Sequence, residues 1–238
     1  MATPFLTARW SNLVLISYKV DPASLRPLLH PALELDTWDG CAHVSLVAFD
    51  FLDTRVRGCR VPGYVNFPEV NLRAYVRHGE RRGVSFLREL VPSRLVAMVA
   101  RLRYHEPYHA ARMRSAVSLV GTDLEVMHDW ELDDHGYRLR VRGSQTTSTP
   151  PDSAIEHHFK EHEWGFGRTR AGALLTYRVE HPVWAVREVR EMECDVYFGA
   201  LYGSAWERLS HQPPVSVVFA VGSEVAVYPP TSFPRSPG

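Results

Sequence analysis

The sequence predicts a predominantly β (α+β) fold, an antiparallel barrel or cone of about ten strands with three or four flanking helices. Segments with strand patterning recur along the 238-residue chain, and short turns bearing Gly or Asp join several of them as hairpins. The chain is 45% hydrophobic and 23% charged, which suffices for a substantial core. Closing the sheet would remove its exposed edges. We expect a single domain over residues 1–228 and a disordered, Pro/Ser-rich tail over residues 229–238.

The N-terminal half is expected to alternate strands with two helices. Strand patterning covers residues 12–20, 41–52, 67–77 and 84–87. Asp21 and Pro22 are typical of a helix start, as the cap and the first helical residue. Ser93 is placed to cap the second helix, which should run to about residue 103. The buried side of that helix is expected to carry Leu95, Val96, Val99 and Leu102.

The C-terminal half is again rich in strand patterns. Strands are expected over residues 113–120, 124–132, 137–142, 174–180, 184–193 and 215–228. The polar stretch 144–153, which contains proline, is the best candidate for a mobile loop. Asp152 or Ser153 then caps a helix that runs to about residue 163. A further helix is expected over residues 197–209.

Composition excludes several classes of function. Lys+Arg and Asp+Glu both number 27, so neither nucleic acid nor a membrane is expected as a partner. Lys19 and Lys160 are the only lysines, which leaves few candidates for amine catalysis. The three cysteines, Cys41, Cys59 and Cys194, are an odd number without a paired framework, which favours a reducing compartment. They form no C-x-x-C pair, which argues against a thiolate zinc site. We find neither a signal peptide nor a long apolar run and expect a soluble cytoplasmic protein.

One stretch, residues 67–77, concentrates the polar side chains of the expected site. With a period of two, one face of this strand is apolar and the other carries Glu69, Asn71, Arg73, Tyr75 and Arg77. Neighbours in this row are about 7 Å apart, so it either lines a polar cavity or forms a solvated face. In a cavity, Glu69 could act as a general acid or base and Arg73 could hold a carboxylate or enolate. The alternative is a structural Glu69–Arg73 ion pair inside the barrel.

Two further polar clusters are candidates. Glu106, Tyr108 and His109 lie at an element boundary, where Tyr108 could stabilise an oxyanion and His109 could carry a proton. The alternative is a loop that caps the preceding helix and packs Tyr108. His158 and His162 are four residues apart, as on metal-binding helices, but the acid of the zincin pattern is misplaced. A solvated amphipathic helix is favoured, and no metal is predicted.

No cofactor is expected. The chain has no G-x-S-x-G elbow, G-x-G-x-x-G loop or P-loop, so hydrolase and nucleotide chemistry lack support. The isolated aromatic and imidazole side chains are interpreted as packed core or cavity-wall residues: His43, His181, Trp164 and Trp184.

Several short motifs occur in an order that resembles a known family. They are Trp10, residues 20–22 with 25 and 29–31, residues 35–36 with 39–40, 67–77 with 83–86, 107–108 with 111–113, and 181–184. Over roughly residues 8–195 the chain resembles the YqjF-like bacterial family of unknown function, which is distantly related to acetoacetate decarboxylase. The resemblance implies a β-barrel or cone with a central cavity and flanking helices, often assembled as oligomers. A homo-oligomer is therefore a further expectation.

The resemblance also bears on the chemistry of the cavity. In acetoacetate decarboxylase, adjacent lysines after a Gly-x-Pro turn form a Schiff base with the substrate. The matching segment here is Pro107-Tyr108-His109, where tyrosine and histidine replace the lysines. Schiff-base decarboxylation is therefore not expected. The resemblance pairs Glu69 with the relative's active-site carboxylate, whereas residues 163–167 depart from the family's usual tryptophan- and arginine-containing segment.

Three functions are compatible with these observations. The first is a binding protein for a small organic acid, with Glu69, Asn71 and Arg73 lining the cavity and Tyr108 closing one end. The second is a lyase or hydratase acting on small keto acids. In that case Glu69 is the acid or base, Arg73 the anchor, and Tyr108 or His109 the proton relay. The third is a structural domain without a ligand, for which a filled barrel interior is expected.

Overall fold

The structure is a computed structural model that describes residues 3–104 and 107–233 of the chain. Its strands form one 15-stranded sheet with mostly antiparallel neighbours, which confirms the predominantly β fold predicted from the sequence. The main strands of the body are β1 (Leu6–Val20), β3 (Ala42–Val56), β5 (Phe67–His78), β6 (Arg81–Val91), β11 (Trp164–Arg168), β12 (Leu174–Glu180) and β14 (Ser216–Val227).

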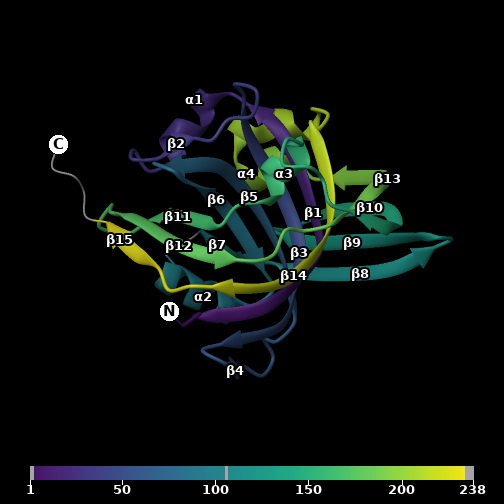
Figure 1. The fold of residues 1–238 in the computed structure, drawn as a ribbon, viewed down its shortest axis with the longest axis horizontal. Helices are drawn as coiled ribbons and strands as arrows, with labels where there is room; N and C mark the ends of the chain where they lie inside the picture. Colours follow the sequence, from purple (N-terminus) through teal and green to yellow (C-terminus); the bar gives the residue numbers. More distant parts are fainter. Residues whose placement is uncertain (1–2, 105–106, 234–238) are drawn as a thin grey trace.

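Beyond β14 the sheet continues as an arm that projects to one side of the body (Figure 1). The strands of the arm are β13 (Val186–Asp195), β10 (His135–Ser148), β9 (Asp123–Leu132) and β8 (Arg112–Val120). The short strands are β2 (Glu34–Leu35), β4 (Cys59–Arg60), β7 (Tyr108–Ala110) and β15 (Thr231–Phe233). The helices are α1 (Pro22–Leu25), α2 (Arg94–Tyr104), α3 (Ile155–Lys160) and α4 (Phe198–Tyr202), with 3-10 segments η1 (Arg26–Leu28) and η2 (Ser204–Ser210). None of the described helices has the length and apolar character needed to cross a membrane.

Pairing between β12 and β14 closes the body into a ring. The path runs from β12 through β11, β6, β5, β3 and β1 to β14, and Val179 of β12 lies opposite Val227 of β14. Most of these neighbours are antiparallel, whereas β11 and β7 each pair with β6 in parallel. Gly83 of β6 allows β11 to approach, because a Cβ atom there would overlap the carbonyl group of Trp164.

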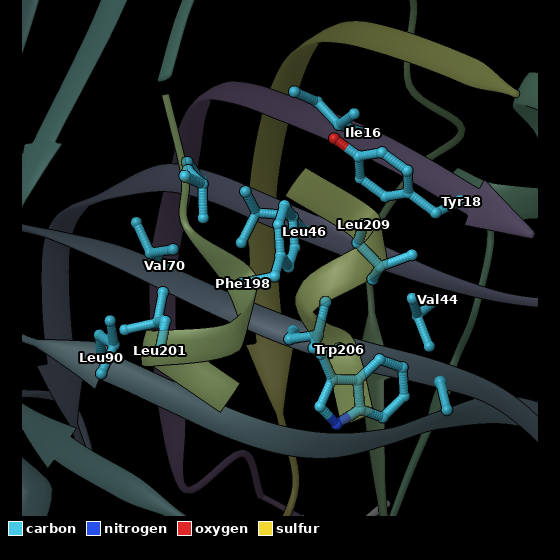
Figure 2. Packing of buried hydrophobic residues seen from close by; sticks show 14 of the residues in the cluster. Ile16, Tyr18, Val44, Leu46, Val70, Leu90, Phe198, Leu201, Trp206 and Leu209 are labelled. Atoms are coloured by element: carbon cyan, nitrogen blue, oxygen red, sulfur yellow. The ribbon is translucent and has the colours of Figure 1, made fainter. Parts of the chain in front are cut away.

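Both faces of β5 are buried, and they face different environments. The side chains of Val70, Leu72, Ala74 and Val76 belong to the main apolar core. Figure 2 shows this core where Phe198, Leu201, Trp206 and Leu209 of the α4–η2 segment pack over the sheet. The opposite face of β5 carries the polar row of residues 69–75, which is also buried. The barrel therefore has a filled side and a side that contains polar groups.

Two helix starts agree with the sequence prediction. The amide of Ala23 donates to Asp21 Oδ1 over 2.9 Å, which caps α1. The amide of Val96 donates to Ser93 Oγ over 3.3 Å at the start of α2. The predicted cap of α3 is wrong, since Ala154 occupies that position and its side chain cannot accept a hydrogen bond.

The predicted buried side of α2 is wrong in part, and the side chain of Val99 lies outside the described residues. Leu95 and Leu102 are exposed, whereas Ala97 is buried and Val96 and Ala100 face the interior. The helix packs on β6 and β7. Small side chains let the backbone of the helix approach these strands, and Leu102 remains outside.

Two segments expected to be irregular form strands. Residues 144–148 belong to β10 rather than to a mobile loop: although their side chains are polar, Ser144 pairs with β9, and Thr147 and Ser148 pair with β13. In the predicted disordered tail, residues 231–233 form β15 and pair with β12. Residues 234–238 of that tail lie outside the described residues.

Candidate functional site

A cavity of about 350 Å³ lies inside the barrel on the polar face of β5. Most of its wall is apolar, and its aromatic lining includes Trp10, Phe49, Phe51, Phe67, Phe86 and Trp184. Leu95, Val96 and Ala100 of α2 also line it. The interior of the barrel is therefore not filled. A purely structural domain would be expected to have a filled interior.

Three neighbouring strands bring the polar groups of the cavity together. Glu69, Asn71 and Arg73 line the cavity from β5. In the sheet register, Asn71 lies opposite Glu89 of β6, and Glu89 lies opposite Tyr108 of β7. All five side chains line the same cavity, so the interpretation of the row as a solvated strand face is wrong.

Glu69 is the centre of this polar group. Its side chain is only 3% exposed and accepts hydrogen bonds from Asn71 Nδ2 at 3.0 Å and from the Tyr108 hydroxyl at 3.4 Å. Burial raises the pKa of Glu69 to about 7, and these two hydrogen bonds and the charge of Arg73 limit that rise. A carboxyl group with this pKa can both accept and donate a proton at neutral pH.

Arg73 places a guanidinium group against the cavity, and no carboxylate among the described residues forms an ion pair with it. Its Nη2 donates to the carbonyl oxygen of Phe159 over 2.9 Å. Its Nε is buried and has no hydrogen-bond partner among the described residues. The ion pairs found in this part of the chain do not include Arg73 with Glu69, so the alternative of a structural Glu69–Arg73 pair lacks support.

The remaining members of the row have structural roles. The hydroxyl of Tyr75 shares a hydrogen bond of 2.5 Å with Ser45 Oγ and donates to the Phe159 carbonyl over 3.3 Å. It therefore connects β5 to β3 and to the end of α3. Arg77 is exposed and forms a 2.7 Å ion pair with Glu34 of β2. The cavity uses only the first three polar residues of the row.

The structure separates the two candidates next to Pro107. Tyr108 reaches the cavity, as described above, whereas His109 is not among the described residues that line it. His109 lies opposite Leu90, whose side chain is part of the main core, so it points to the other side of the sheet. Burial, together with the charges of Arg88 and Arg101, lowers the pKa of His109. Glu106 lies outside the described residues.

The histidine pair near α3 is buried, so the predicted solvated amphipathic helix is wrong. The helix ends at Lys160, which leaves His162 in the following segment. His158 Nδ1 lies 2.7 Å from Arg82 Nη2, and His162 Nε2 lies 3.7 Å from Asp36. Burial lowers the pKa of each histidine to about 4. Within residues 3–104 and 107–233, no group of three or more His, Cys, Asp or Glu side chains is arranged to hold a metal ion.

Neither lysine belongs to the described lining of the cavity. Lys19 is exposed, and the buried Lys160 donates from Nζ to Glu161 Oε1 over 2.5 Å. Trp184 does line the cavity and stacks on His181, with ring centroids 4.1 Å apart. This arrangement agrees with the interpretation of Trp184 as a wall residue and of His181 as a packed histidine.

Sequence reasoning missed two features of the site. One is Glu89, for which the carboxylate between the apolar residues Leu87, Leu90 and Val91 was a usable signal. The Phe159 carbonyl, which holds Arg73, has no signature in the sequence because any residue supplies a carbonyl group. The aromatic wall is likewise spread over residues far apart in the chain.

Comparisons with known proteins agree with this architecture. The model of the family DUF2071, described as an uncharacterized conserved protein, matches residues 7–224. The uncharacterized protein YqjF of Bacillus subtilis (strain 168) is 37% identical over 107 residues, which are 44% of this chain and 44% of that protein. The match thus spans less than half the length of this curated relative.

The fold is similar to that of acetoacetate decarboxylase-like enzymes. One such enzyme from Sphingomonas wittichii RW1 superimposes with a TM-score of 0.67 at 15% identity, covering 96% of this chain and 92% of that one. Acetoacetate decarboxylase from Legionella pneumophila gives a TM-score of 0.66 at 13% identity, covering 98% and 88%. The enduracididine biosynthesis enzyme MppR complexed with pyruvate gives 0.65 at 14% identity, covering 98% and 91%. At such low sequence identities, the similarity shows a shared fold and nothing more.

Proposed function

The chain belongs to the DUF2071 family, and we propose that it binds a small organic acid in the cavity of its barrel. In this proposal the carboxylate of the ligand meets Arg73 and Asn71, and the apolar part lies against the aromatic wall. Glu69 and Tyr108 form the neighbouring polar surface. The cavity volume of about 350 Å³ falls in the range usual for small-molecule sites.

The observation that carries the proposal is the state of Arg73. A buried guanidinium normally pairs with a carboxylate, since desolvating an uncompensated charge is costly. The contact found for Nη2 is a neutral carbonyl group, and Nε has no partner among the described residues. A ligand carboxylate would supply both the missing charge and an acceptor for Nε.

Asn71 supports the same assignment. Its Nδ2 donates to Glu69, while its buried Oδ1 lacks a hydrogen-bond partner in the described part of the chain. An unpaired acceptor beside a carboxylate-binding arginine suits a ligand that also carries a hydroxyl group or a protonated acid. Glu69 can adjust to an added anion by taking up a proton, because its pKa is about 7.

Displacement of a neutral fluorescent probe, N-phenyl-1-naphthylamine, tests the proposal. Octanoate, octan-1-ol and octylamine share an apolar chain and differ in the head group, so they compete for the probe with matched tails. We expect octanoate to displace the probe at a concentration about tenfold or more below that of octan-1-ol, as a charge-assisted contact adds about 1.5–3 kcal/mol.

Two arginine variants identify the anchor. Arg73→Gln should remove the preference for octanoate, whereas Arg77→Gln should keep it, because Arg77 lies on the same strand outside the cavity. Equal displacement by the three head groups in the wild-type protein would overturn the proposal. So would an unchanged preference in Arg73→Gln with its fold retained in circular dichroism.

A second candidate function is a lyase or hydratase that acts on small keto acids without a Schiff base. The observation in its favour is the buried Glu69, whose pKa of about 7 suits an acid or base and whose carboxylate contacts the Tyr108 hydroxyl. Arg73 would anchor the substrate carboxylate and Tyr108 would relay the proton. Among the structural relatives, MppR is described in complex with pyruvate, a small keto acid.

Proton NMR of pyruvate or acetoacetate incubated with the protein tests this second candidate. Turnover that is lost in Glu69→Gln, in a variant that still displaces the probe with octanoate, would favour an enzyme over a binding protein. Turnover that survives in Glu69→Gln would remove Glu69 from the mechanism. Borohydride reduction should give no covalent adduct, and an adduct would overturn the inference that no lysine takes part.

A further inference from the structure

The outer side of α2 carries an apolar stripe that the described part of the chain leaves uncovered. Leu95, Met98 and Leu102 are 44%, 50% and 61% exposed. Their spacing of three and seven residues places them within one narrow sector of the helix surface. A second set of neighbouring exposed aliphatic residues, Val117, Leu119 and Val120, lies on the edge strand β8 in the arm, away from the cavity.

The inner side of the same helix is a wall of the cavity. Val96 and Ala100 line the cavity, and the half-exposed Leu95 lines it at the boundary with solvent. Arg101 Nε donates to the Tyr108 carbonyl over 2.5 Å, which ties α2 to the strand that carries the Tyr108 hydroxyl. One helix therefore separates the cavity from whatever contacts the stripe.

Charge identifies the kind of partner that fits the stripe. Residues 92–104 include Arg94, Arg101 and Arg103 and contain no Asp or Glu. Arg94 and Arg101 are exposed. Packing α2 against α2 of a second copy would oppose these arginines with one another, which is unfavourable. A partner that accepts aliphatic side chains and attracts arginine is the surface of a bilayer containing anionic lipid.

We propose that α2 docks this stripe on an anionic bilayer surface, with Met98 and Leu102 in the interfacial region and Arg94 at the lipid headgroups. Because the whole chain has a net charge of zero, the attraction is local to this short helix. The binding is therefore weak, reversible and sensitive to salt. This docking places the cavity directly behind the lipid surface, so an apolar acid could enter the cavity from the bilayer. The docking proposal does not depend on the proposed ligand and is tested without it.

Flotation of the full-length protein with vesicles tests the proposal. The vesicles consist of phosphatidylcholine alone or of phosphatidylcholine mixed with phosphatidylglycerol. We expect the protein to float with the mixed vesicles only, and to be released by high salt. Met98→Glu combined with Leu102→Glu should lower the partition coefficient by about tenfold or more, since three aliphatic side chains provide the apolar contact.

Two further variants test the assignment. Arg94→Gln should lower the partition coefficient about fivefold, the effect of one arginine near an anionic surface. Leu119→Glu is the matched control, because Leu119 is 64% exposed on β8 in the arm, and it should bind as the wild type does. Thermal unfolding followed by circular dichroism verifies that each variant is folded.

Several outcomes would overturn the proposal. One is wild-type protein that fails to float with the mixed vesicles at low salt. Another is an equal loss of binding in Leu119→Glu and in the double α2 variant. A third is a wild-type dimer in sedimentation analysis that the double variant converts to a monomer while vesicles bind neither protein. That result would assign the stripe to a second copy of the chain.

Discussion

The buried carboxyl group of Glu69 makes the stability of the protein depend on pH in a predictable direction. Its pKa is raised from the ordinary 4.5 to about 7, mainly because burial disfavours the charged form. The folded state therefore holds this proton more tightly than the unfolded state does. Stability falls as pH rises from about 4.5 to 7, and the full loss is reached above pH 7.

The magnitude follows from the gap between the two pKa values. A tenfold change in a protonation constant corresponds to about 1.4 kcal/mol, so the change from 4.5 to about 7 corresponds to about 3 kcal/mol. Glu69→Gln removes the ionisation and keeps the shape of the side chain. The glutamine carbonyl can still accept a hydrogen bond from Asn71 or Tyr108, which limits any loss of packing.

Urea unfolding of the wild type and Glu69→Gln between about pH 5 and pH 8.5 measures this effect. The free energy of unfolding of the variant should gain about 2–3 kcal/mol relative to the wild type over that range. The contributions of the buried histidines cancel in this difference because both proteins contain them. Glu80→Gln, at an exposed turn, should show no such change. Two pH profiles that stay parallel within about 0.5 kcal/mol would refute the reasoning.

Three other substitutions test separate parts of the structure. Gly83→Ala should cost about 2–4 kcal/mol in urea unfolding, because the added methyl group overlaps the Trp164 carbonyl, whereas Gly136→Ala meets open space and should cost little. Burial lowers the pKa of His162 to about 4, so the wild type should lose stability as pH falls from 6.5 to about 4. His162→Gln should reduce this loss by up to about 3 kcal/mol, and an unchanged dependence of stability on pH in this range would contradict the reasoning. Arg73→Met should stabilise the ligand-free protein by about 1–3 kcal/mol in thermal unfolding while abolishing selectivity for octanoate, and a loss of stability would argue for a structural role.

The position of the site could be predicted because local patterning encodes it. In residues 67–77 the period of two separates Val70 and Leu72 from Glu69 and Asn71, whatever the neighbouring strands are. The partners of this row could not be predicted in the same way. Glu89 lies opposite Asn71, and Tyr108 lies opposite Glu89, through the register of β6 and β7, which depends on how distant segments pair.

The errors have a common physical origin in tertiary context. In α2 the larger aliphatic side chains were expected inside, yet packing against β6 and β7 favours Ala97, whose small side chain permits close approach. Residues 144–148 have polar side chains, yet Ser144 pairs with β9, and Thr147 and Ser148 pair with β13. His162 was expected on a solvated helix, but the helix ends at Lys160 and the imidazole turns into the interior beside Asp36.

The unpaired atoms of the polar row explain why a ligand is the better account of the cavity than a scaffold. Each buried polar atom without a partner costs about 1–3 kcal/mol, and Asn71 Oδ1 and Arg73 Nε both lack one among the described residues. Tyr75, on the same strand face but outside the cavity lining, has its hydroxyl bonded to Ser45 and Phe159. The unpaired atoms are confined to the part of the row that lines the cavity. In the proposed function, a bound acid supplies the partners that these atoms lack among the described residues.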